Sequence, residues 1–319
     1  MHLTLNKNLW LVVLFLGLTA CQNLPLPQDS RAASSPQKSK HPTDIYGPPR
    51  ITGQLKAREI NESSGLVASA SPGIYWTHND SGDGPFLYAI DEKGESRGVW
   101  RVAGADASDW EDIAAGPGPD PRKRYLYVGD IGDNDTNRSE VVVYRIPEPT
   151  IAASDSRSSK TRPRVTEPAE AFKLRYPDGK HDAEALMVHP ITGDFYIVSK
   201  IPFANPSVYK ASAPLNTGRI IILARKTELN VPSVLGGLIT GGDISPDGRR
   251  VALCDYLQGY ELLLPDGDPN FDDIWKQTFN KIDLGRRKQG ESIAYRLDGR
   301  ALLATSEGVG SPLIEVLRR

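Results

Sequence analysis

Residues 112–130 read DIAAGPGPDPRKRYLYVGD, and the architecture follows from the pattern in this stretch. A small or acidic residue precedes a short apolar run, a turn follows, and a second β-compatible run ends in a polar or charged residue. The same arrangement occurs five times, and the copies begin at Ser64, Asp112, Glu184, Asp243 and Glu291. The intervals of 48 to 72 residues are close to the ~40–50 residues of a four-stranded propeller blade with loops added.

Each copy leaves room for two further strands before the next copy begins. In the third copy these would be residues 208–210 and 220–224. The fifth copy lacks one strand, because the chain ends soon after residues 313–317, and the β-compatible run 51–60 could supply it. The sequence therefore predicts an all-β protein, a β-propeller of five four-stranded blades closed by an N-terminal strand. A sixth blade within residues 135–180 is the alternative, whereas a β-sandwich would not explain the repeat.

Tight turns join the first two strands in three of the copies. They read Ile191-Thr192-Gly193-Asp194, Pro246-Asp247-Gly248 and Leu297-Asp298-Gly299. Glycine next to aspartate is typical of hairpins, since glycine adopts positive φ without steric cost. We interpret these turns as structural.

The N-terminus resembles the signal peptide of a bacterial lipoprotein. Leu9 to Leu18 is an unbroken apolar run, shorter than the ~20 residues of a permanent transmembrane helix. Leu18-Thr19-Ala20-Cys21 resembles a lipobox, which implies that Cys21 carries acyl chains such as palmitate and begins the mature chain. Gln22 in the next position resembles an outer-membrane address in a Gram-negative host. An ordinary signal peptide with a chance cysteine is the alternative.

Composition places a linker after this signal. Residues 22 to about 50 are rich in Pro, Ser, Gln and Lys and show no periodicity, as expected of a solvated spacer. The domains are therefore a signal peptide (1–20), the lipidated cysteine with a flexible linker (21–50) and the propeller (51–319).

The net charge of −2 gives no argument for nucleic-acid binding. Cys254 has no partner for a disulfide and is expected in the core. We expect a monomer attached to the membrane through its lipid, with an unknown small-molecule or protein ligand.

Charged residues recur at two positions of the repeat, the start of the first strand, where only the first copy has an uncharged residue (Ser64), and the end of the second strand. Both positions lie at one end of an antiparallel hairpin, so in a propeller they would surround one axial mouth. Glu62 and Asp182 would lie on the same strand face, two residues earlier. The predicted metal ligands are Asp80, Asp112, Asp130, Asp133, Glu184, Asp243, Glu291 and Glu307. The predicted ligand-binding side chains beside them are His78, Arg138 and Lys200.

This concentration of carboxylates favours a hard cation. Like charges in such a ring cannot all ionise cheaply without one, and Ca²⁺ accepts six to eight oxygen ligands in flexible geometry. Histidine and cysteine are scarce, which disfavours zinc and copper. The loops 78–84 and 129–135 are rich in Asp, Asn and Gly but lack EF-hand spacing. Ca²⁺ is the expected cofactor, and another cation or a hydrated acidic funnel are the alternatives.

Several motifs together resemble a known group of proteins. They are NESSGL (61–66), HNDSGD (78–83), DWEDIA (109–114), GDIGDN (129–134) and DAEAL (182–186). The set is similar to a largely uncharacterised bacterial family of secreted or lipid-anchored β-propellers, and the resemblance covers most of residues 58–310. It implies the propeller fold and supplies no activity.

Three functions are compatible with these observations. The first is a binding or scaffolding lipoprotein whose mouth holds a cation and a ligand or partner. The second is a metal-dependent hydrolase of phosphoesters or other anionic substrates, and the third is a glycosidase that uses paired carboxylates. Trp76 and Trp110 could stack on a sugar or lie in the core. No Gly-x-Ser-x-Gly elbow, P-loop or HExxH motif occurs, and no catalytic residue is assigned.

Overall fold

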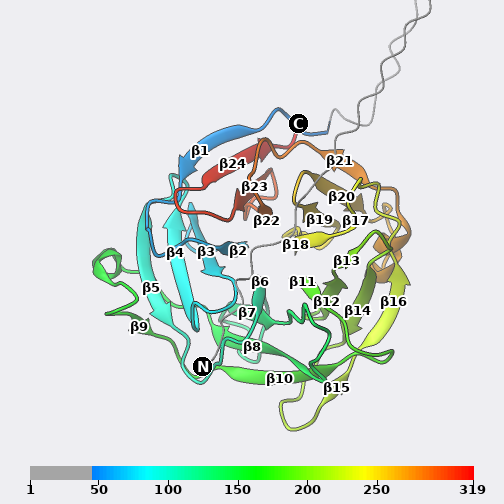
Figure 1. Cartoon of the computed structure of the whole chain (residues 1–319), viewed down its shortest axis with the longest axis horizontal. Coiled ribbons are helices and arrows are strands. Elements are labelled where there is room, and N and C mark those ends of the chain that lie inside the picture. The colour runs from blue at the N-terminus through cyan, green and yellow to red at the C-terminus, as the bar shows by residue number, and fades with distance from the viewer. Residues whose placement is uncertain (1–44) are drawn as a thin grey trace, which may run out of the picture. The chain divides into compact units, whose positions relative to one another are not determined.

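The computed structural model describes residues 45–319, which form five antiparallel blades around a common axis (Figure 1). In four of the blades the first strand in the chain lies innermost and the following strands lie successively further out, whereas in the fifth the earliest strand of the chain lies outermost. The predicted five-bladed β-propeller is therefore confirmed. The predicted signal peptide and Cys21 lie outside the described residues. Among residues 45–319, no helix has the length and apolar character needed to cross a bilayer.

Blades 1 to 3 follow one another along the chain. Blade 1 consists of β2 (Ser63–Ala68), β3 (Ile74–Asn79), β4 (Phe86–Asp91) and β5 (Ser96–Arg101). Blade 2 consists of β6 (Trp110–Gly116), β7 (Tyr125–Asp130), β8 (Val141–Pro147) and β10 (Glu170–Arg175). Blade 3 consists of β11 (Ala183–Val188), β12 (Phe195–Ser199), β14 (Ser207–Ala211) and β16 (Ala224–Glu228).

Blades 4 and 5 complete the ring. Blade 4 consists of β18 (Ile239–Ile244), β19 (Arg250–Asp255), β20 (Gly259–Leu263) and β21 (Asn280–Ile282). Blade 5 consists of β22 (Gly290–Tyr295), β23 (Ala301–Ser306), β24 (Pro312–Leu317) and the N-terminal β1 (Arg50–Gln54). β1 pairs antiparallel with β24, which confirms the predicted closing strand. This closure satisfies the outer edge of blade 5 and joins the two ends of the propeller.

Short elements lie outside the four-stranded pattern of the blades. β9 (Arg164–Val165) pairs with β5, β13 (Ile201–Pro202) pairs with β17 (Gly236–Gly237), and two 3₁₀ helices cover Ala153–Arg157 and Phe271–Lys276. One predicted strand differs in its placement. Residues 220–224 were expected in blade 3, but β15 (Ile221–Ile222) pairs with β10 of blade 2, and the polar β16 is the outer strand of blade 3. The reason is apolar burial, because Ile221 and Leu223 pack into the core between blades 2 and 3.

The hydrophobic core lies between the faces of neighbouring blades. Between blades 1 and 2, Trp76 and Trp100 meet edge to face with their ring centroids 4.9 Å apart, and Trp110 packs in the same cluster. Trp76 and Trp110 are buried, so they are core residues and not a surface for stacking a sugar. Cys254 is also buried, between blades 4 and 5. Both faces of the innermost strands are covered, so nearly all of their residues are buried, polar ones included.

A β-bulge interrupts every innermost strand near its start. The register between first and second strands shifts once in each blade, after Ser63, Trp110, Ala183, Ile239 and Gly290. A bulge inserts an extra residue and changes which side chains face a given direction. The residues that open the mouth are therefore Ser64, Glu111, Glu184, Thr240 and Glu291. Asp112 and Asp243 were predicted at the mouth. The prediction is wrong for both, because the observed register places them further along their strands.

Side chains in the channel connect the inner strands of different blades. Asp112 Oδ2 accepts hydrogen bonds from the Leu186 amide in blade 3 (3.0 Å) and the Gly242 amide in blade 4 (3.2 Å). Ser64 Oγ donates to the Glu111 carbonyl of blade 2 at 2.6 Å, and Thr240 Oγ1 donates to the Gly290 carbonyl of blade 5 at 2.9 Å. These bonds link blades that share no strand pairing, so the channel is held together by side chains.

Asp112→Ala is expected to lower the free energy of unfolding by at least ~2 kcal/mol, because it leaves the Leu186 and Gly242 amides buried without an acceptor. Asp112→Asn should retain most of the stability, since its one carbonyl oxygen can replace Oδ2. Urea denaturation of the purified protein measures both effects. Asp135→Ala is the control, because Asp135 is exposed and has no partner within residues 45–319. An Asp112→Ala protein as stable as the wild type would contradict the role of this carboxylate.

Candidate metal centre

Three carboxylates from two blades meet at the axial mouth. Asp80 follows β3 of blade 1, Asp109 precedes β6 of blade 2, and Glu111 is the bulged residue of β6. One oxygen from each lies within 4.8 Å of the other two. The Gly132 backbone closes this site from the side, and a side chain at that position would collide with the carboxylates of Glu111 and Asp109.

Glu111 is the most unusual member of this triad. It is only 3% exposed, and among the described residues its carboxylate has no hydrogen bond or ion pair. Burial and the neighbouring Asp80 and Asp109 raise the pKa of Glu111 well above its ordinary value. The carboxylate of Asp109 is also without a hydrogen-bond donor, and burial with the charges of Asp80 and Asp182 raises its pKa to about 6. A buried charged group without a partner is costly, so the arrangement favours a bound cation.

The side-chain cations near the triad are already paired elsewhere. Lys200 forms an ion pair with Glu184 and lies 5.6 Å from the ring centre of Tyr256. Arg138 forms an ion pair with Asp130 at 2.8 Å and donates to the Gly132 carbonyl at 2.8 Å. The protein therefore provides carboxylates in excess at this point of the mouth.

A second acidic pair lies on the blade 5 side of the mouth. Glu291 is the bulged residue of β22, and Glu307 follows β23. Burial, the charge of Glu307 and a hydrogen bond with it raise the pKa of Glu291 well above its ordinary value. Gln289 Nε2 donates to Glu291 at 2.9 Å. The two carboxyl groups can therefore share a proton.

Several predicted ligands support loops and do not join the triad. Asp130 accepts the amides of Ser108 (3.1 Å) and Asp109 (3.2 Å), so it positions the segment that carries Asp109. Asp133 accepts the amides of Asn137 and Arg138 at 2.7 and 2.8 Å. Both carboxylates accept hydrogen bonds from backbone amides, and they thereby hold in place the segments on either side of Gly132.

His78 was expected at the mouth and lies in the core. It is fully buried, its Nδ1 pairs with the Asn79 carbonyl at 2.8 Å, and its ring packs edge-on against Trp110. Burial lowers the pKa of His78 to about 4, so the ring is neutral at physiological pH. A neutral ring in this position cannot offset the charge of an anionic ligand.

The sequence-based prediction missed Asp109 and Glu111. Both belong to the Asp109-Trp110-Glu111-Asp112 segment, in which alternate residues share a strand face. The alternation of Asp109 and Glu111 around a core tryptophan was an available signal, but the bulge that makes Glu111 the mouth residue has no signature in the sequence.

Comparisons with known proteins add little to this geometry. No protein-family model matches the chain, and no curated protein matches it. A crystal structure of a nidogen/laminin complex is similar, with a TM-score of 0.44 and 12% sequence identity over 77% of this chain and 72% of that chain. At that distance it carries no inference about a ligand or partner.

Asp243 lies at the far end of the channel from the mouth. Its carboxylate accepts the amides of Tyr295 and Ile244, each at 2.8 Å. Burial raises the pKa of Asp243 to about 7, although these bonds and the charge of Arg124 oppose the rise. A predicted metal ligand is thus a half-buried acid that joins blades 4 and 5.

Asp243→Asn is expected to flatten the dependence of stability on pH. In the wild type, the raised pKa of Asp243 stabilises the fold fully below about pH 4, and this contribution is lost as the pH rises to about 7. The loss is at most ~1.4 kcal/mol per pH unit for a single group. Urea denaturation across this pH range measures it, with Asp135→Asn as the control. Identical pH profiles for the wild type and Asp243→Asn would refute this assignment.

Proposed function

We propose that this protein is a lipid-anchored β-propeller of the cell envelope that binds Ca²⁺ at its axial mouth and, through it, a polar ligand or partner. The observation that carries the proposal is Glu111, a nearly buried carboxylate without a partner that faces Asp80 and Asp109. Holding a buried carboxylate next to two half-buried ones is costly unless a cation compensates their charge.

The spacing of the triad suits calcium. Ca²⁺–oxygen distances are about 2.3–2.6 Å, so two oxygens on one ion can lie up to about 5 Å apart. The three oxygens lie within 4.8 Å of one another, which satisfies this limit. Mg²⁺ requires oxygens about 2.0–2.1 Å away in strict octahedral geometry. Any two oxygens of the triad that lie near the 4.8 Å limit would therefore have to move closer together to bind Mg²⁺.

The mouth leaves positions for a ligand. Three carboxylates supply fewer oxygens than the six to eight that Ca²⁺ accepts, unless every one is bidentate. Water or an anionic group of a ligand would complete the shell, and the Lys200 ammonium lies close enough to affect the pKa of Asp80 and Glu111. A calcium ion with open positions supports the binding of a carboxylate- or phosphate-bearing ligand.

A metal-dependent hydrolase or a glycosidase is the second candidate. The pairing of Glu291 with Glu307 favours it, because burial and the charge of Glu307 raise the pKa of Glu291, and a carboxyl group with a raised pKa can act as a general acid. The distinguishing observation is calcium-dependent turnover of a phosphoester or glycoside that Glu291→Gln abolishes without loss of calcium binding. A binding protein would show calcium binding and no turnover.

Glu111→Gln is expected to weaken calcium binding by about ten- to a hundred-fold, since it removes one charge-assisted contact. Without calcium, the same variant should melt at a higher temperature than the wild type, because the like-charge repulsion with Asp80 and Asp109 is gone. Calorimetry and thermal melting of the chelator-treated protein, with and without calcium, measure both effects. Glu95→Gln is the control, as this glutamate is exposed at the turn between β4 and β5. If millimolar calcium neither binds nor stabilises the wild type, the metal site is excluded.

Cys21→Ser is expected to prevent lipid attachment and release the protein from the membrane fraction. Two or more acyl chains anchor a protein stably, whereas a chain without lipid has no such attachment. Labelling with radioactive palmitate in a Gram-negative host, followed by fractionation, measures this. Cys254→Ala is the matched control, since it removes the other cysteine and should leave labelling unchanged. Label retained by Cys21→Ser would rule out the lipobox.

A further inference from the structure

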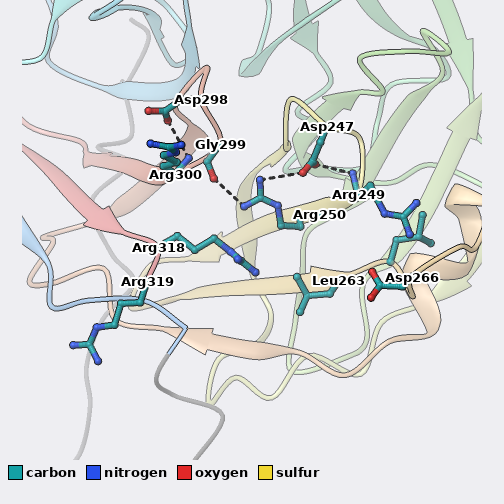
Figure 2. A pocket seen from close by; sticks show the side chains of 11 residues that line it. Asp247, Arg249, Arg250, Leu263, Asp266, Asp298, Gly299, Arg300, Arg318 and Arg319 are labelled. Carbon is teal, nitrogen blue, oxygen red and sulfur yellow. Dashed lines mark hydrogen bonds and ion pairs between the residues drawn. The ribbon is translucent and has the colours of Figure 1, made fainter.

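An arginine-lined pocket lies at the opposite end of the blades from the acidic mouth. It has a volume of about 640 Å³ and lies between the β18–β19 turn of blade 4, the β22–β23 turn of blade 5 and the end of the chain after β24 (Figure 2). The two turns carry the same sequence, Asp247-Gly248-Arg249 and Asp298-Gly299-Arg300. The repeat therefore places equivalent arginines on both sides of one cavity.

Three guanidinium groups in this pocket lack a hydrogen-bonded carboxylate. Arg249 donates to the carbonyl oxygens of Pro265 and Asp268, which are neutral. Arg300 is exposed, and its side chain has no hydrogen bond or ion pair among residues 45–319. Arg318 lies 3.8 Å from its nearest carboxylate oxygen, on Glu261, and its Nε is buried without a partner.

A fourth arginine makes the pocket rigid. Arg250 donates to the Gly299 carbonyl at 2.9 Å and contacts Asp247 at 3.4 Å (Figure 2). Its guanidinium carbon also lies 5.0 Å from the ring centre of Tyr295. Arg250 thereby ties the turn of blade 4 to the turn of blade 5. A wall fixed in this way loses little entropy when a ligand binds.

The acidic residues of the pocket do not cancel this charge. Asp247 accepts the Arg249 amide at 3.1 Å, and Asp298 accepts the Arg300 amide at 3.0 Å, so both are occupied by their own turns. Of the lining carboxylates, Asp266 alone has no hydrogen bond among the described residues. Five arginines and three aspartates line the pocket, and Arg249 and Arg300 have no carboxylate partner among the described residues, so the lining carries net positive charge.

We propose that this pocket binds the phosphate group of a phosphorylated small molecule, such as a sugar phosphate. The guanidinium groups come from two turns and the chain end, and a tetrahedral phosphate, whose oxygens do not lie in one plane, can accept hydrogen bonds from more directions than a planar carboxylate. The volume is in the range of small-molecule pockets and exceeds that of phosphate alone. The site is independent of the metal centre, because it lies on the other face.

Calorimetry on the purified full chain tests this proposal, with glucose 6-phosphate, inorganic phosphate and glucose as probes. Chelator is present throughout, so that a cation at the mouth cannot contribute. Glucose 6-phosphate should bind, glucose should not, and Arg300→Gln should weaken binding by roughly tenfold through loss of a charge-assisted hydrogen bond. Equal affinity for inorganic phosphate would also support the phosphate site and would identify free phosphate as a sufficient ligand.

Arg219→Gln is the matched control, since Arg219 is an exposed arginine of blade 3 without a partner among the described residues. It removes the same charge far from the pocket and should leave affinity unchanged. Because Arg300 makes no contact that the fold requires, the thermal melts of both variants should match the wild type. Absence of binding to both phosphate probes at millimolar concentration would overturn the proposal, as would equal weakening by Arg219→Gln and Arg300→Gln.

Discussion

The propeller depends on a buried carboxylate in its channel. Asp112 accepts amides from blades 3 and 4 as well as the amide of Ile113, and so connects strands that belong to separate sheets. Such connections matter because backbone hydrogen bonds hold each blade together but leave neighbouring blades joined chiefly by apolar packing. Burying an acid is costly, and burial does raise the pKa of Asp112 well above its ordinary value. The three amide donors offset this cost, since each would otherwise be buried unsatisfied.

The bulge beside Asp112 links this structural role to the candidate site. It turns Glu111 toward the mouth, while the next residue reaches into the channel. Two adjacent residues therefore differ sharply. The Asp112 carboxylate accepts hydrogen bonds that connect three blades, whereas the Glu111 carboxylate has no hydrogen bond among the described residues. Glu111 breaks the rule that buried polar groups have partners, and such violations are expected at functional sites, where stability is given up for binding.

The blades separate charge along their axis. The inner strands begin at the mouth, where Asp80, Asp109, Glu111, Glu291 and Glu307 gather, and the strand 1–2 turns at the other end carry Arg249 and Arg300. A net charge of −2 conceals this separation, because the acids and bases of the whole chain nearly balance. Among residues 45–319, carboxylates without a hydrogen-bond donor, Asp109 and Glu111, therefore lie at the mouth, and guanidinium groups without a carboxylate partner, Arg249 and Arg300, lie at the opposite end.

The sequence by itself determined the blade repeat and favoured five blades over six with an N-terminal closing strand, because these follow from alternating apolar runs and turn residues that act locally. It also indicated that one mouth would be acidic. Only the tertiary structure decided which carboxylates meet there, since a bulge in every inner strand moves Asp112 and Asp243 into the channel and puts Glu111 in the mouth. Asp80 and Asp109 come together across two blades, and Arg249 and Arg300 do so across two others. Such contacts depend on how blades pack side by side, a relation that no local pattern of residues encodes.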